Sequence, residues 1–171
     1  LFLFKMTGPG GAPWRNASTG ALNGYVKLPT RITDQDNGLM GITWVDLDNN
    51  DTADLAYGTD LKGQVWRFDL RDSNPANWRV GLYDPAVTGA ENLKEGIPLF
   101  TAKDAEGQVL PITSAPAATF PSYGGIMLSF GTGRALESGD FPDVSRTQRF
   151  ITVWDRGGYA GDRTFAVPKV L

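Results

Sequence analysis

VDLDNNDTADLAYGTDLKGQVWRFDL, residues 45–70, contains the two features that decide the fold. Its first part is a run of closely spaced Asp and Asn side chains. Its second part, residues 64–69, mixes apolar and polar residues with the period of two that is typical of a strand. The stretch therefore predicts an acidic loop that connects two neighbouring strands.

The acidic run at residues 46–54 has the spacing of a calcium-binding loop. Ligand-type oxygens fall at alternate loop positions, from Asp46, Asp48, Asn50, the Thr52 carbonyl and Asp54. Calcium takes about six to eight oxygen ligands, which a tightly curled loop can supply from alternate residues. We expect these five residues to bind Ca²⁺, the one cofactor that the sequence predicts.

The residues after Asp54 distinguish two kinds of calcium loop. LAYGTD offers neither a bidentate Glu nor an exiting helix, so a strand-to-strand loop fits better than an EF-hand. A plain acidic surface turn remains the alternative, because Asp and Asn favour turns through their own hydrogen bonds. Asp51 stands where such loops normally carry Gly, and Asp tolerates the left-handed conformation at some cost in rigidity.

Short strand-like runs recur along the chain, with Gly 21 and Pro 11 distributed between them. Helical periodicity is nearly absent, so we predict an all-β fold. The predicted strands are residues 1–6, 41–45, 54–57, 64–69, 112–120, 126–130 and 150–154. The irregular stretches between them, residues 8–20, 71–96 and 137–148, predict long loop insertions on the surface.

Three of these runs resemble one another weakly: LFLFKMTG (1–8), GQVWRFDL (63–70) and RFITVWDRGG (149–158). A propeller blade has four strands and repeats about every 40 to 50 residues, so the wider separations here require insertions. We predict part of a modified β-propeller, about two to three blades. Because the chain starts without Met, we expect residues 1–171 to be a fragment of a longer protein.

The composition excludes several classes of function. The chain has no Cys and no His, which removes disulfides, thiol nucleophiles, imidazole bases and the usual zinc sites. Its net charge is −3 and it has no Lys/Arg run, so nucleic acid is not an expected partner. No apolar stretch approaches the roughly 18 residues that span a bilayer, so we expect no transmembrane segment.

Other acidic and aromatic residues are weaker candidates. Two clusters could hold a second metal ion, although the first is typical of a turn and the second of solvated surface. They are Asp34, Asp36 and Asn37, and Glu137, Asp140 and Asp143. Among the tryptophans, we expect Trp44, Trp66 and Trp154 to pack in the core, and Trp14 and Trp78 to be the more exposed ones.

Three blocks together resemble the C-terminal β-propeller of the PilY family, which comprises tip and biogenesis proteins of bacterial type IV pili. They are residues 45–70, PLFTAKDAEGQVLPITSAPAATFP (98–121), and MLSFGTGRALESGD with RFITVWDRG (127–140 and 149–157). The resemblance covers roughly residues 40–158 and is more specific than the acidic loop alone. Thr59 and Asp51 depart from it, because the family usually has Gly at both positions.

The resemblance implies a secreted protein at the pilus tip, associated with the outer surface of a bacterium. Such a protein works with minor pilins in pilus assembly and contributes to surface attachment and twitching motility. The resemblance also implies that the calcium loop takes part in switching between pilus extension and retraction. The chain has no Arg-Gly-Asp triplet, so integrin binding of that kind is not expected. The sequence does not identify the surface receptor.

Two other functions stay open. Quinoprotein dehydrogenases are propellers that also use calcium, but they hold it against a quinone in the central channel, whereas the ligands here are contiguous in one loop. Integrin-type FG-GAP propellers have a calcium loop of nearly the same spacing, repeated in neighbouring blades, and this chain shows one strong example. We therefore predict a binding and adhesion module rather than an enzyme.

Overall fold

The computed structural model of the protein describes residues 1–5, 14–15, 22–30, 36–82, 96–140, 146–157 and 169–170. Within these ranges the chain forms strands and short 3-10 helices, with no α-helix. The all-β prediction is confirmed. The elements are β1 (Phe2–Phe4), β2 (Trp14–Arg15), β3 (Leu22–Asn23), β4 (Tyr25–Lys27), β5 (Leu39–Val45), β6 (Leu55–Asp60), β7 (Gln64–Asp69), η1 (Pro75–Asn77), β8 (Arg79–Val80), β9 (Phe100–Thr101), β10 (Ala117–Thr119), β11 (Ile126–Gly131), η3 (Ser138–Asp140), β12 (Phe150–Asp155) and β13 (Lys169–Val170).

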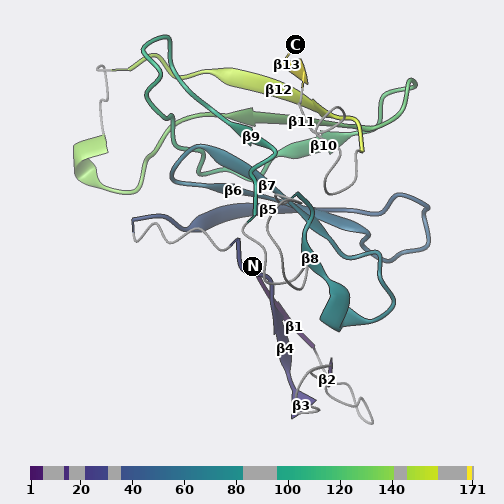
Figure 1. The fold of residues 1–171 in the computed structure, drawn as a ribbon. Coiled ribbons are helices and arrows are strands. Elements are labelled where there is room, and N and C mark those ends of the chain that lie inside the picture. The colour runs from purple at the N-terminus through teal and green to yellow at the C-terminus, as the bar shows by residue number, and fades with distance from the viewer. Residues whose placement is uncertain are drawn as a thin grey trace.

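Two larger sheets form the body of the molecule (Figure 1). In the first, β5, β6, β7 and β8 are neighbours in that order, and β9 pairs with the start of β7. In the second, β10, β11, β12 and β13 follow one another in chain order. All these pairs are antiparallel, as expected for strands joined by direct connections. The β1–β4 ribbon projects from the first sheet at the bottom of Figure 1.

The main core fills the space between the two sheets. β11 buries Ile126, Leu128 and Phe130 and leaves the residues between them half-buried, as the period of two in a strand requires. Buried residues of the first sheet, Tyr57 and Val65 among them, belong to the same cluster. The two sheets are therefore held together mainly by the burial of apolar surface.

A second apolar cluster covers the opposite face of the first sheet. Ala56, Trp66 and Phe68 are all buried there, and Leu28 packs against them. As a result β6 is buried along its whole length, on both faces. The prediction that Trp66 lies in the core is confirmed.

The prediction for Trp44 is wrong, because half of its surface is exposed. It lies on β5, the edge strand of its sheet, whereas Trp66 lies on β7, which has a neighbouring strand on each side. Trp154 is half-buried. Trp78 is also half-buried and packs against the second cluster, contrary to the prediction of greater exposure. The side chain of Trp14 lies outside the described part of the chain.

One predicted strand is much shorter than expected. Of residues 112–120, β10 includes only Ala117–Thr119. Pro111 and Pro116 have no backbone N–H to donate to a ladder. Between them, Ile112 makes an isolated bridge to Gly133, and its N–H donates to the Asp60 carbonyl at 3.1 Å. In the described residues, none of the helices is long and apolar enough to cross a membrane.

Candidate metal centre

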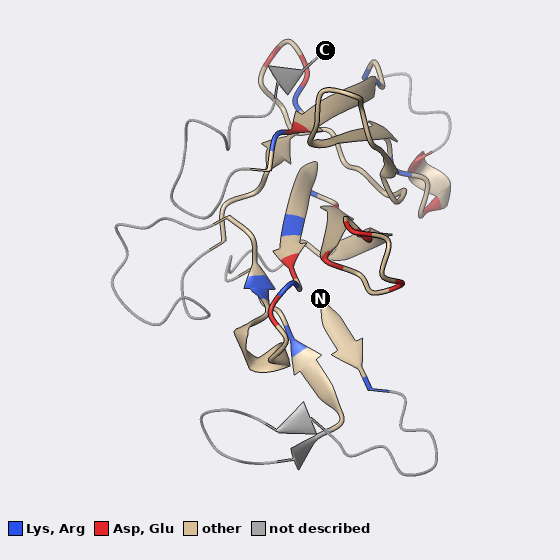
Figure 2. Cartoon of the chain, turned by 90° about the vertical axis from the view of Figure 1, so that its right-hand side faces the viewer, with Lys and Arg blue, Asp and Glu red and all other residues tan. Residues whose placement is uncertain are grey.

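The acidic loop joins β5 to β6. Val45 and Leu55 are the last pair of the two strands, and the Asp54 N–H donates to the Val45 carbonyl at 2.9 Å, which closes the base of the loop. In Figure 1 the loop lies at the right-hand side. Figure 2 faces that side and shows acidic residues gathered along it. The local prediction of a loop between two neighbouring strands is confirmed.

Three of the predicted ligands converge. One carboxylate oxygen each from Asp46, Asp48 and Asp54 can be chosen so that all lie within 4.8 Å of one another. Asp54 also accepts a hydrogen bond from the Leu47 N–H at 2.7 Å, which fixes its carboxylate across the loop. Carboxylates this close repel one another unless a cation lies among them.

The remaining two predicted residues lie on the same curl of chain. The side-chain oxygen of Asn50 accepts the Thr52 N–H at 2.8 Å, and its amide nitrogen donates to Asp48 at 3.0 Å. Three carboxylates, an amide and a backbone carbonyl make a set of hard oxygen donors. Calcium prefers such a set, so the residues present fit it.

Backbone N–H groups turn inward and hold Asp46. The carboxylate of Asp46 accepts hydrogen bonds from Asp51 N at 2.9 Å, Asp48 N at 3.2 Å and Asn50 N at 3.3 Å. Desolvation acts to raise the pKa of Asp46, but the hydrogen bonds from Asp51, Asn50 and their neighbours outweigh it and lower that pKa. Asp46 is therefore kept ionised, as a metal ligand must be.

The tight curl is made without glycine. Asn49 and Asp51 both adopt the left-handed conformation, with φ of 57° and 63°. Asn and Asp are the non-glycine residues that enter this region most readily. Asp51 thus adopts the conformation that Gly provides in other calcium loops.

The two weaker acidic clusters are occupied by protein contacts where the structure describes them. Asn37 donates to Asp60 at 2.9 Å. Asp140 accepts hydrogen bonds from the N–H groups of Leu136 and Glu137 and from the Arg134 guanidinium, which together lower its pKa. These contacts favour a structural role for both clusters. Asp34 and Asp143 lie outside the described residues.

Sequence reasoning missed two buried aspartates. Asp60 accepts from the backbone N–H groups of Lys62 and Gln64 and from the Trp66 indole, so it stabilises the β6–β7 turn. The Asp-Leu-Lys-Gly run at residues 60–63 could have indicated this turn. Asp155 accepts hydrogen bonds from Tyr57 and Arg67, which lie 98 and 88 residues away in the sequence. No local signal in the sequence indicates partners at such a distance.

Two antiparallel sheets packed face to face, with an acidic loop between adjacent strands of one sheet, define an incomplete β-propeller that does not close on itself. The family model of the PilY1 beta-propeller domain matches residues 16–170, and the chain belongs to this family.

Curated relatives carry the same family name. The type IV pilus biogenesis factor PilY1 of Pseudomonas aeruginosa is 34% identical over 144 residues, which are 81% of this chain and 12% of that protein. A type IV pilus biogenesis factor PilY1 homolog of Xylella fastidiosa is 30% identical over 121 residues, 71% of this chain and 8% of that protein. The chain therefore spans about a tenth of the length of these relatives.

A solved structure agrees with the fold. The crystal structure of the Pseudomonas aeruginosa PilY1 C-terminal domain matches with a TM-score of 0.64 and 29% sequence identity. The match covers 90% of this chain and 32% of that domain. The predicted partial propeller is confirmed by this agreement.

Proposed function

We propose that this chain is a calcium-binding segment of a type IV pilus biogenesis factor and that calcium at residues 46–54 biases pilus extension against retraction. The observation that carries the proposal is the convergence of Asp46, Asp48 and Asp54 within 4.8 Å on a loop between two strands. Membership of the PilY1 family supports the connection to pili.

The residues of the loop give the proposal its physical basis. Bound calcium supplies two positive charges, which offset most of the negative charge of the three carboxylates. A ligand that binds only the folded state stabilises it by about 2.7 kcal/mol at a concentration 100 times its Kd. Without that contribution, Asp46, Asp48 and Asp54 repel one another, and the loop and the start of β6 at Leu55 loosen.

The propeller then acts as a binding module whose calcium loop has two states, ordered when calcium is bound and loosened when it is not. In this proposal the protein lies outside the cell at the pilus tip, contacts minor pilins and contributes to surface attachment and twitching motility. Its role is non-enzymatic, since the donor set is complete within one loop without an organic cofactor. The name of the Pseudomonas aeruginosa relative, a type IV pilus biogenesis factor, supports the assembly role.

A segment exchange tests the function in cells. The matching part of PilY1 in Pseudomonas aeruginosa is replaced by this chain, without change or with Asp54→Ala, Asp54→Lys or Asp51→Gly. Surface pili and twitching are measured at several calcium concentrations. We expect Asp54→Ala to show the calcium-free behaviour at every calcium concentration. Asp54→Lys should show part of the calcium-bound behaviour even without calcium, because its ammonium partly stands in for the ion, and the Asp51→Gly control should keep the calcium response. Wild-type behaviour of both Asp54 variants would refute the switching role.

A further inference from the structure

A cavity of about 350 Å³ lies between the two sheets, beside the acidic loop. Its apolar wall comes from both sheets, with Leu47 and Leu55 on one side and Phe120 and Ile126 on the other. Leu55 and Ile126 are buried, whereas Leu47 and Phe120 are 43% and 60% exposed and lie at the mouth. Small-molecule sites in proteins typically have volumes of about 300–1,000 Å³ and mostly apolar walls. This cavity has the size and the walls of such a site.

The polar groups of the lining are paired within the protein. The Tyr57 hydroxyl donates to Asp155 at 2.7 Å, and Arg67 donates to both oxygens of the same carboxylate at 2.9 and 3.0 Å. Arg71 pairs with both oxygens of Asp69, at 2.9 and 2.6 Å. These groups therefore call for neither a cationic nor an anionic ligand.

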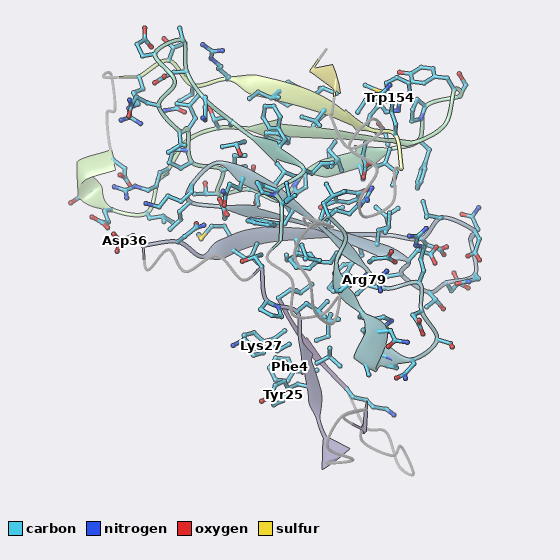
Figure 3. The ribbon with its side chains drawn as sticks, viewed as in Figure 1. Phe4, Tyr25, Lys27, Asp36, Arg79 and Trp154 are labelled. Atoms are coloured by element: carbon cyan, nitrogen blue, oxygen red, sulfur yellow. The ribbon has the colours of Figure 1, made fainter. Side chains whose placement is uncertain are left out.

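Arg156, the last charged residue of the lining, also has partners. Its guanidinium carbon lies 5.7 Å from the centroid of the Trp154 ring, and it makes further contacts. The Trp154 indole is fixed in turn, because it donates to the Gly124 carbonyl at 3.0 Å. Figure 3 shows Trp154 at the same end of the sheet as the β10–β11 connection. Since a charged ligand would lose water without gaining an unpaired partner, the cavity favours an uncharged ligand that contacts the apolar wall.

One side of this wall is built from the acidic loop itself. Leu47 stands between Asp46 and Asp48, and its N–H donates to the Asp54 carboxylate at 2.7 Å. Leu55 follows Asp54 directly and begins β6. Both leucines are thus attached to the three carboxylates that converge within 4.8 Å. A loop that loosens therefore takes this side of the wall with it, and an ordered loop holds the wall in place.

We propose that this cavity binds a small uncharged molecule with an aromatic ring, and that this ligand and calcium in the loop strengthen each other's binding. This coupling rests on the calcium site of the proposed function and adds a second ligand to it. An apolar cavity of about 150 Å³ is enough to bind benzene, so this one holds one or two fused rings but not a stretch of polypeptide. Coupling between two sites is reciprocal, so each ligand raises the affinity for the other by the same factor.

Titration of the full chain with indole, followed by NMR in excess calcium and again with a chelator, tests the proposal. We expect indole to shift the resonances of Phe120 and Ile126, which lie outside the loop, and to bind at least about fivefold more weakly without calcium. Calorimetry should show calcium affinity raised by the same factor in saturating indole. Equal indole affinity in the two conditions, or absence of binding in calcium, would overturn the proposal. Tighter binding of an acetylated and amidated Gly-Trp-Gly peptide than of indole would overturn the assignment to a small molecule.

Matched variants assign indole binding to the cavity. Leu47→Ala removes part of the wall but keeps the backbone N–H that donates to Asp54, so it should weaken indole binding roughly five- to tenfold and leave calcium binding without indole unchanged. Leu136→Ala is the control, because Leu136 is also exposed and lies outside the lining. Phe120→Ala should likewise weaken indole binding, whereas Phe150→Ala, at another exposed phenylalanine outside the lining, should not. Equal effects within either pair would contradict the site.

The coupling and the pilus switch fail through different results. Calcium binding by calorimetry with an indole affinity that does not depend on it would overturn the coupling and leave the calcium site standing. Cooperative binding of calcium and indole in solution, with normal twitching of the Asp54 variants in cells, would overturn the switch and leave the coupling standing. Absence of calcium binding would overturn both.

Discussion

Arg67 on β7 and Asp155 at the end of β12 form a buried salt bridge across 88 residues of sequence. One guanidinium nitrogen of Arg67 lies 2.9 and 3.0 Å from the two carboxylate oxygens, and the residues are only 5% and 3% exposed. β7 belongs to the first sheet and β12 to the second. The contact therefore connects the two sheets by a buried charge pair.

Removal of one partner of this salt bridge should lower the stability of the fold. Asp155→Ala leaves the Arg67 charge buried without its partner, so we expect a loss of about 3–5 kcal/mol in the free energy of unfolding. Urea unfolding followed by Trp fluorescence measures it. Arg134→Ala breaks an ion pair with Asp140 in which the arginine side chain is 46% exposed, and should barely move the midpoint. Similar midpoints for the two variants would show that the buried pair does not hold the sheets together.

The stability should also fall at high pH because of Tyr57. Burial and the Asp155 carboxylate raise the pKa of Tyr57, whereas an unfolded tyrosine titrates near pH 10. The resulting stabilisation is fully present below about pH 10 and is lost as the pH rises toward the folded-state pKa. Unfolding free energies measured from about pH 8 to 11 should fall less steeply for Tyr57→Phe than for the unmutated chain. Parallel pH profiles would contradict this origin.

Gly41 should not tolerate a methyl group. A Cβ at this position of β5 would lie 2.2 Å from Ala115 N and 2.5 Å from Ala115 Cα. The clash is with backbone, so Gly41→Ala should cost about 1–3 kcal/mol or more in the free energy of unfolding. Gly131→Ala is the control, because no atom lies within 4 Å of its added Cβ. Equal melting temperatures for the two variants would contradict the close approach of β5 to residues 114–115.

Local patterns predicted the local structure well. The predicted strand at residues 64–69 coincides with β7, and the loop at residues 46–54 connects β5 to β6. Both predictions depend on the spacing of neighbouring residues, which strand and loop geometry impose directly. Asp46, Asp48 and Asp54 converge for the same reason, since only seven residues lie between the first and the last.

Long-range relationships were not predictable from these patterns. Trp44 and Trp66 occur in similar strand-like runs, yet one lies on an edge strand and is half exposed while the other is 1% exposed. The order of strands in a sheet depends on contacts between distant segments, which periodicity does not encode. For the same reason, the sequence patterns did not predict the hydrogen-bonded network of Tyr57, Arg67 and Asp155 or the cavity that these residues line.

Calcium titration of the full chain by calorimetry tests the central claim of a calcium site at residues 46–54 most directly. We predict one site with an affinity in the broad micromolar to millimolar range of sensor and extracellular sites. Asp54→Ala should abolish the binding heat, because it removes one of three converging carboxylates. Asp51→Gly should keep it, because Asp51 is outside that set and glycine suits its φ of 63°. Absence of heat at millimolar calcium, or equal loss in the two variants, would contradict the account.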